Sequence, residues 1–195
     1  TTASLMARLY DPTGGTVLLD GKDIRSYHED KRTAKIGFIL QEPLLFTGTV
    51  RENILYGNEQ YASLSNGQLE EVLRQTDLKN LMRRFEDGLE TKLQSNGDLI
   101  SIGQKQLIAF MRAVLRNPNL LILDEATANI DTITEQVLGD ILKRLPASTT
   151  LVIIAHRLNT IENADGIFFV NSGKVIPAGS LDHAMNMLLH DKRRS

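Results

Sequence analysis

The chain has 195 residues, which fits one domain of ordinary size with room for two lobes, and 42% of them are hydrophobic, enough for a buried core. It contains no cysteine, which excludes disulfides, thiolate metal sites and a cysteine nucleophile. A net charge of −2 disfavours general electrostatic binding of nucleic acid, and no apolar stretch approaches the roughly 18 residues of a membrane-spanning helix.

The first part of the chain predicts one helix followed by two strands. Apolar residues recur at helical spacing over residues 3–9, and turn-forming residues at 11–15 end that helix. Segments 16–20 and 35–40 have strand character, and Pro43 then breaks the chain. This part therefore predicts the beginning of a sheet.

A helical pattern extends from about residue 49 to residue 116. A capping-box pattern at Thr49–Glu52, and again at Ser65–Gln68, predicts that a helix begins at each place. Apolar spacing predicts a short helix over 78–85 and a longer one after Ser101. The apolar face of the longer helix consists of Leu107, Phe110, Met111, Val114 and Leu115.

The last part of the chain has continuous apolar runs at 120–123, 150–155 and 166–170, separated by helical stretches. Such runs suit strands of a parallel sheet whose two faces are both covered. The predicted fold class is therefore α/β, with a mostly parallel sheet core and a helical insertion. The expected segments are 1–48 (core), 49–116 (helical subdomain) and 117–195 (return to the core).

Two carboxylates, Asp124 and Glu125, follow the apolar run at 120–123. A buried strand delivers such residues to the carboxyl edge of the sheet, where open α/β folds bind ligands. There Asp124 could hold Mg²⁺, and Glu125 could orient or deprotonate an attacking water. A strand followed by an acidic helix cap is the alternative, and this segment alone does not separate the two.

The turn Ser101-Ile102-Gly103-Gln104 precedes the longest predicted helix, and Ser101 is placed to cap it. The free amides of a helix N-terminus form an anion site. Taken alone, this turn is better explained as an ordinary capped helix.

His156 and Gln41 each follow an apolar strand. An imidazole at a strand end could hydrogen-bond a phosphate oxygen or a water, and a carboxamide could contact a metal-bound water. Taken singly, His156 is also compatible with a surface histidine and Gln41 with a turn residue.

The order and spacing of these motifs resemble the ATP-binding cassette (ABC) ATPase family over essentially the whole chain. Gln41–Phe46 is similar to the Q-loop, Ile100–Gln104 to the signature motif, and Leu120–Glu125 to the Walker B strand. Ala128–Asp131 resembles the D-loop, and His156 the switch histidine. The segments Arg8–Pro12 and Phe46–Ile54 resemble those of exporter-type members.

This resemblance implies a P-loop NTPase-like fold that binds ATP and Mg²⁺ and hydrolyses ATP to drive export. Asp124 would serve Mg²⁺, and Gln41 would sense it and couple to a transmembrane domain. Glu125 would be the catalytic base, and His156 would steady the γ-phosphate and the water. The implied location is the cytoplasmic face of a membrane, within an integral membrane transporter.

The resemblance also implies a partner, since the family's domains pair head to tail around two ATP molecules. Ser101 and Gly103, with Gln104 in the same signature turn, would bind the γ-phosphate held by the other copy. Asp131 would link the two sites. The implied partners are thus a second nucleotide-binding domain and a transmembrane domain, with no nucleic acid.

Two departures from the family pattern bear on activity. Alignment of Arg8–Pro12 with the family places Thr1 directly after the expected Gly-Lys-Ser/Thr, so the Walker A loop and the strands before it are not among the 195 residues. By itself the chain is therefore expected to bind ATP poorly and not to turn it over. Ile102 stands where the signature usually has glycine, which permits positive φ and close approach of a phosphate; an active variant is expected.

Two other functions remain open at this point. A degenerate ABC module could act only by association, although Glu125 and His156 are both present. A soluble ABC ATPase could act on DNA or ribosomes, which the net charge and the exporter-like segment Phe46–Ile54 disfavour.

Overall fold

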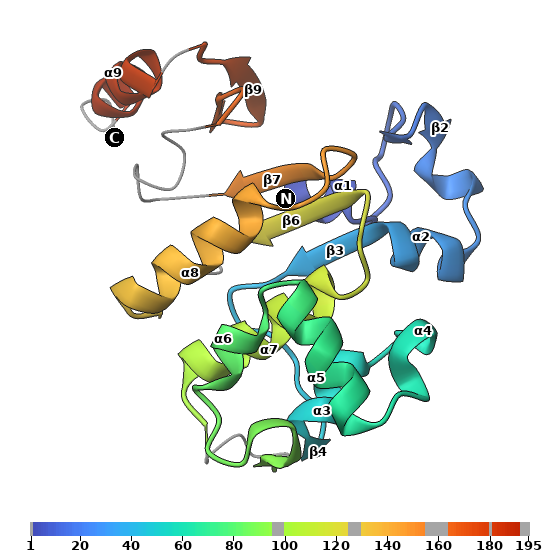
Figure 1. The fold of residues 1–195 in the computed structure, drawn as a ribbon. Helices are drawn as coiled ribbons and strands as arrows, with labels where there is room; N and C mark the ends of the chain where they lie inside the picture. Colours follow the sequence, from blue (N-terminus) through green and yellow to red (C-terminus); the bar gives the residue numbers. More distant parts are fainter. Residues whose placement is uncertain (1, 95–99, 125–129, 155–163, 180, 192–195) are drawn as a thin grey trace. The chain divides into compact units, whose positions relative to one another are not determined.

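The structure, a computed structural model, describes residues 2–94, 100–124, 130–154, 164–179 and 181–191 (Figure 1). The chain divides into two compact units, residues 1–154 and 155–195. Within the described part of the chain, no helix combines the length and the apolar character needed to cross a membrane.

A three-stranded parallel sheet forms the centre of the first unit. Its order is β3 (Ile36–Ile39), β6 (Leu120–Asp124) and β7 (Thr150–Ile154), with β6 in the middle. The strands predicted at 35–40, 120–123 and 150–155 are therefore confirmed to within two residues, and so is the α/β class.

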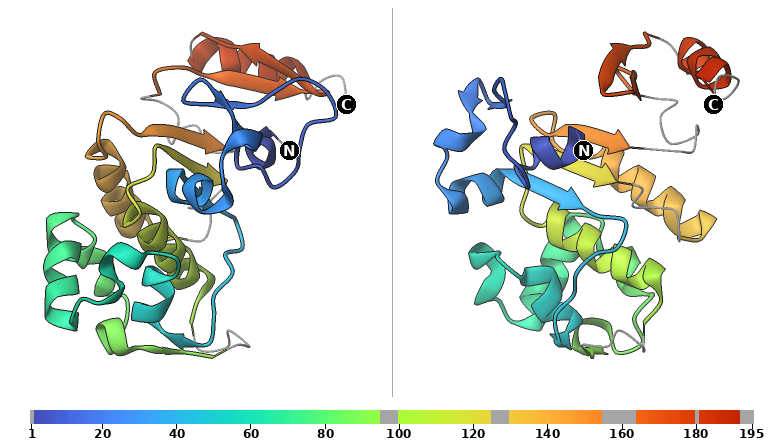
Figure 2. Two further views of the ribbon diagram at one scale, coloured as in Figure 1. Left: turned by 90° about the vertical axis from the view of Figure 1, so that its right-hand side faces the viewer. Right: turned by 180° about the vertical axis from the view of Figure 1, so that it is seen from behind.

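The central strand β6 has a covered face on each side, which explains its uninterrupted apolar sequence. Leu121 and Leu123 point into a large core shared with α7 (Ile102–Val114) and α8 (Thr132–Lys143). Ile122 points the other way and packs with Ala3 of α1 (Thr2–Met6) and with Ile24. Figure 2 shows α7 and α8 on one face of the sheet and α1 on the other.

The N-terminal segment differs from the prediction in three places. Helix α1 ends at Met6 rather than at residue 9, because Arg8 has a positive φ of 52°. The strand expected at 16–20 shortens to β1 (Leu18–Leu19), which pairs antiparallel with β2 (Lys22–Asp23). The structure then adds a 3-10 turn, η1 (Ile24–Ser26), and a helix that was not predicted, α2 (Glu29–Lys35).

The stretch from residue 48 to 114 is mainly helical, as expected. Its helices besides α7 are α3 (Val50–Leu55), α4 (Glu59–Ala62), α5 (Asn66–Gln75) and α6 (Lys79–Met82). It also contains a 3-10 turn, η2 (Gly88–Glu90), and a short ladder between β4 (Gly48–Thr49) and β5 (Lys92–Leu93).

Three complete capping boxes begin helices in this stretch. They are formed by Thr49 with Glu52 at α3, Ser65 with Gln68 at α5 and Ser101 with Gln104 at α7. All five residues of the predicted apolar face of the longest helix are buried, each less than 9% exposed: Leu107, Phe110, Met111, Val114 and Leu115.

The second unit contains a hairpin and a helix, α9 (Leu181–Asp191). Strand β8 (Phe168–Asn171) pairs antiparallel with β9 (Lys174–Pro177). The prediction that the run at 166–170 extends the parallel sheet is therefore wrong. Ser172 and Gly173 both have positive φ, 47° and 76°, which is the conformation of a two-residue type I′ hairpin turn. This turn brings a local partner strand alongside β8.

Candidate functional site

Two of the predicted site residues lie at the same edge of the parallel sheet. Asp124 is the last residue of β6, and Gln41 lies two residues beyond β3. The parallel register pairs Ile39 with Leu123, so both chains leave the sheet at its carboxyl edge. Such an edge is where open α/β sheets bind ligands.

The donor chemistry at this edge suits magnesium. Asp124 supplies a partly buried carboxylate, and Gln41 carries a carboxamide. Mg²⁺ is commonly held by one or two carboxylates while phosphate oxygens and waters fill its other positions. Among the described residues, no group of three or more acidic or histidine side chains forms a complete metal cage. Glu125 and His156, the predicted base and switch histidine, lie outside the described residues.

The Q-loop-like segment, residues 41–46, is attached to α7 by two side chains. Gln106, which is 1% exposed, donates from Nε2 to the carbonyl oxygen of Gln41 at 3.1 Å. One turn and a half further along α7, Arg112 donates from Nη1 to the carbonyl oxygen of Leu44 at 3.0 Å. The position of this loop therefore follows the position of α7.

Arg112 also joins the loop to α3. Its Nε donates to the carbonyl oxygen of Asn53 at 2.7 Å, and its guanidinium lies 5.6 Å from the ring centre of Phe46 and 5.8 Å from that of Tyr56. Burial, followed by the neighbouring charge of Arg116, lowers the pKa of the Arg112 guanidinium. The two aromatic rings provide a favourable face for this partly desolvated cation.

An exposed apolar patch lies beside this attachment. Leu44 is 76% exposed, Phe46 45% and Tyr56 54%, and the two aromatic rings contact each other with centroids 4.3 Å apart. Grouped apolar residues on a surface indicate an interaction site more often than scattered ones do. We call Leu44, Phe46 and Tyr56 the aromatic patch.

The signature-like turn forms the N-terminus of α7. Gln104 donates its backbone N–H to Ser101 Oγ at 3.1 Å, and Ser101 donates its backbone N–H to Gln104 Oε1 at 2.9 Å. The Gln104 side chain also donates from Nε2 to the carbonyl oxygen of Arg84 at 2.6 Å. The first amides of a helix have no partner within it, so the turn around Ile102 and Gly103 has the chemistry of an anion site.

Ile102 is the first residue of α7 and adopts the helical conformation, with a half-exposed side chain. The positive φ for which glycine is suited is therefore not required at this position. The isoleucine therefore causes no backbone strain in the turn, and the activity of this variant stays a prediction.

Asp131 caps the N-terminus of α8. Its Oδ1 accepts from the backbone N–H of Thr134 at 3.1 Å, and its Oδ2 accepts from the Thr134 hydroxyl at 2.8 Å. The guanidinium of Arg84 donates to the same carboxylate at 3.0 Å. The hydrogen bonds from Thr134 are the main reason that the pKa of Asp131 lies below its ordinary value, and the charge of Arg84 adds to them.

Sequence reasoning missed four residues that position these motifs: Arg84, Gln106, Arg112 and Asn53. Each acts through contacts with residues distant in the chain or through a buried polar group that no motif describes. A polar residue in an apolar helical face was the local signal, and it applies to Asn53 and Gln106.

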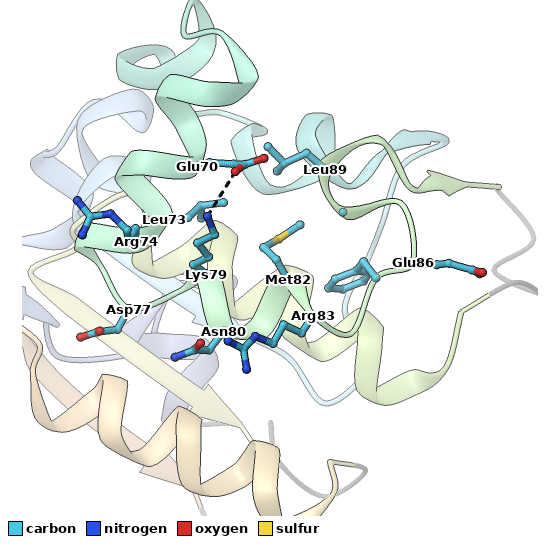
Figure 3. Close-up of a pocket in the computed structure, with 12 residues that line it drawn as sticks. Glu70, Leu73, Arg74, Asp77, Lys79, Asn80, Met82, Arg83, Glu86 and Leu89 are labelled. Atoms are coloured by element: carbon cyan, nitrogen blue, oxygen red, sulfur yellow. Dashed lines mark hydrogen bonds and ion pairs between the residues drawn. The ribbon is translucent and has the colours of Figure 1, made fainter.

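A separate cavity of about 430 Å³ lies in the helical stretch, between α5, α6 and the loop that leads to η2. Figure 3 shows charged side chains of both signs on its walls, including Glu70 and Lys79, which form an ion pair 3.5 Å long. None of the predicted site residues lines this cavity. The described motif residues and the cavity are thus different places in the first unit.

Comparison with known proteins gives a consistent result. Residues 1–128 match the family model for ABC transporters. YfiC, an ABC transporter ATP-binding protein of Bacillus subtilis, is 46% identical over 182 residues, which are 93% of this chain and 30% of that protein. The mitochondrial ATP-binding cassette sub-family B member 10 of Mus musculus is 43% identical over 180 residues, 92% of this chain and 25% of that protein.

A solved structure of a bacterial Atm1-family ABC exporter with ATP bound superimposes with a TM-score of 0.80 at 32% identity. The match covers 97% of this chain and 32% of that exporter chain. The chain therefore spans about a quarter to a third of the length of these three proteins.

Proposed function

Since this chain belongs to the ABC transporter family, we propose that it forms most of the motor domain of an ABC exporter, which binds Mg-ATP and hydrolyses it to ADP and phosphate to drive transport. The observation that carries the proposal is the meeting of Asp124 and Gln41 at the carboxyl edge of β6 and β3. These are adjoining strands whose motif residues lie 83 positions apart in the sequence.

At this edge Asp124 would hold the metal, and the Gln41 carboxamide would contact the metal's water shell. Mg²⁺ held there would supply positive charge that stabilises the phosphate oxygens during hydrolysis. Glu125 would accept a proton from the attacking water, and His156 would hold the water and the terminal phosphate in line. These two roles rest on the resemblance of their motifs.

The signature turn and Asp131 would act on a second copy of the domain. In a head-to-tail pair, the Ser101 hydroxyl and the amides near Gly103 would face the terminal phosphate of the ATP held by the partner. Gln104 would contribute to this turn mainly by fixing its shape, because both ends of its carboxamide already bond to Ser101 and Arg84. Asp131 would lie between the two ATP sites.

The aromatic patch would contact the transmembrane domain. It is the exposed apolar surface adjoining the Q-loop, so a movement of Gln41 and a movement of the patch are linked through α7. The domain would accordingly work at the cytoplasmic face of a membrane.

The test uses the complete transporter and measures Mg-dependent ATP hydrolysis and ATP binding. Glu125→Gln should lower hydrolysis by at least about 100-fold while binding persists, since a positioned general base contributes roughly 10²–10⁴-fold. Glu29→Gln, an exposed change of the same kind on α2, is the control and should retain the rate. A wild-type protein that binds no ATP, or a Glu125→Gln variant with the normal rate, would contradict the motor function.

A second measurement concerns the 195-residue chain by itself. Without the amides and lysine of a Walker A loop, several charge-assisted hydrogen bonds of about 1.5–3 kcal/mol each are missing, on the order of 5 kcal/mol in all. ATP binding should then be near-millimolar or weaker. Extension of the chain upstream by the Walker A segment should restore micromolar binding, and saturable micromolar binding by the short chain would refute this expectation.

A further inference from the structure

Arg84 is the one residue in the described part of the chain that bonds to both the signature turn and the D-loop aspartate. Its carbonyl oxygen accepts from Gln104 Nε2 at 2.6 Å. Its guanidinium donates from Nη2 to Asp131 Oδ1 at 3.0 Å and to Thr134 Oγ1 at 2.6 Å. It lies 20 residues from Gln104 and 47 from Asp131, so no local sequence pattern announces the link.

Two of the three residues bonded to Arg84 belong to helix caps. Gln104 is the third residue of α7 and closes the capping box with Ser101, whereas Asp131 is the N-cap of α8. Arg84 follows α6, which contacts α8 and is drawn beside α7 in Figure 1. One residue therefore ties together the N-termini of two helices that carry separate motifs.

We propose that Arg84 is a positioning residue that couples the signature turn to Asp131 within one chain, so that both present the correct geometry to a second copy of the domain. The proposal rests on the proposed function, in which these two elements act at the same interface. The backbone carbonyl of Arg84 holds the turn, and the side chain holds the N-terminus of α8. A shift of α8 is thereby passed to the turn that faces the partner's ATP.

The exposure of the ion pair separates this role from simple stabilisation. The side chains of Arg84 and Asp131 are 45% and 53% exposed. Exposed ion pairs contribute little to the free energy of folding, because water already solvates both charges. Loss of the guanidinium should therefore leave the fold and the Asp131 cap of α8 intact, while it removes the contact between Arg84 and the first turn of α8.

The chain offers a matched control at the other end of α8. Arg144, the C-cap of α8, forms an exposed ion pair with Asp77, in the loop before α6. This pair also connects the helical stretch to α8, but neither of its residues touches the signature turn or Asp131. If the two ion pairs only stabilise the packing of α8, replacing Arg84 or Arg144 should have the same effect on kcat.

The experiment compares Arg84→Met with Arg144→Met in the complete transporter, with kcat and KM for ATP and the melting temperature measured for each. Methionine keeps an aliphatic stem and the backbone carbonyl. The bond from Gln104 to this carbonyl therefore remains, and only the guanidinium's bonds to Asp131 and Thr134 are lost. We expect Arg84→Met to lower kcat by at least about tenfold, since a misplacement of about 1 Å can cost roughly 100-fold. KM and the melting temperature should change little, and Arg144→Met should retain kcat within about twofold.

Equal effects of the two variants on kcat, or a normal kcat in Arg84→Met, would overturn the proposal while the ATPase function stands. The absence of Mg-dependent ATPase in the wild-type transporter would overturn both. Thr134→Val provides an independent variant, because it removes the second acceptor of the same guanidinium. Because Thr134→Val also removes the hydroxyl that donates to Asp131 Oδ2, it should lower kcat at least as much as Arg84→Met; a normal kcat in Thr134→Val would contradict the proposal.

Discussion

Replacement of Asn53 by alanine tests how the Q-loop-like segment is held. The Asn53 side chain is 1% exposed and forms a two-way bridge to Phe46, accepting from its N–H at 2.9 Å and donating to its carbonyl oxygen at 2.9 Å. It also donates to the carbonyl oxygen of Thr49 at 3.0 Å and accepts from Arg112 Nη2 at 3.2 Å. Four hydrogen bonds thus converge on one buried amide.

The magnitude follows from these contacts. A hydrogen bond contributes about 0.5–1.5 kcal/mol net, and a buried group left without a partner costs about 1–3 kcal/mol. Loss of the bridge to Phe46 and of the bond from Arg112 should destabilise the segment 41–49 by about 3 kcal/mol. Since about 1.4 kcal/mol corresponds to a factor of ten, local opening should become roughly 100-fold more frequent.

The assay is hydrogen exchange of the backbone amides in the complete protein, which reports local opening peptide by peptide. Peptides spanning residues 41–49 should exchange about 100-fold faster in Asn53→Ala, while peptides in β6 remain unchanged. Asn80→Ala is the control, because Asn80 is an exposed residue of α6. Exchange of this segment within about threefold of wild type would show that the bridge does not hold the loop, and the reasoning would fail.

Two further predictions concern packing and pH. Gly37→Ala should destabilise the first unit by about 1–3 kcal/mol in chemical denaturation, because a Cβ on Gly37 would lie 2.8 Å from Leu121 Cδ1; Gly67→Ala, with nothing within 4 Å, should be neutral or stabilising. Thr134→Val should raise the pKa of the Asp131 carboxyl toward its ordinary value in a ¹³C NMR titration, because the Thr134 hydroxyl is the largest cause of the lowered pKa. Since folding lowers that pKa, the ionised Asp131 carboxylate stabilises the wild-type fold at pH values above its ordinary pKa, and this stabilisation is lost as the pH falls through the lowered pKa. An unchanged Asp131 pKa in Thr134→Val would contradict the assigned cause.

The helices and strands that the sequence predicts best are those with strong local signals. The capping boxes at Thr49, Ser65 and Ser101 place three helix starts correctly, because the bonds concerned span only three residues. Continuous apolar runs predict β3, β6 and β7, because both faces of these strands are covered. Helix α2 has no buried residue, so no apolar periodicity indicates it.

The run at 166–170 misled the prediction because an apolar strand segment does not specify its partner. The Ser172-Gly173 turn was the signal that could have corrected it, since two consecutive residues suited to positive φ favour a hairpin. The turn after β8, rather than the sequence of β8 itself, indicates that β8 pairs with β9.

In the candidate site, too, some features could be predicted from the sequence and others could not. Asp124 and Gln41 could be placed together from the sequence, because parallel strands deliver their carboxyl ends to one edge. The contacts of Arg84 with Asp131 and of Arg112 with Leu44 span 47 and 68 residues and depend on how α6, α7 and α8 pack. Only the folded chain specifies them.

Gln106 shows why a polar residue occupies the buried face of α7. Its Nε2 bonds to the carbonyl oxygen of Gln41, whereas its Oε1 is buried and has no hydrogen-bond partner among the described residues. An unpaired buried acceptor costs about 1–3 kcal/mol, so an apolar residue would pack there at lower cost. The amide instead joins α7 to the start of the Q-loop, two residues after Gln104 joins the same helix to Arg84. A rotation of α7 would therefore move Gln41 and the turn at Ser101–Gln104 together, and in the proposed function this would link the two motifs.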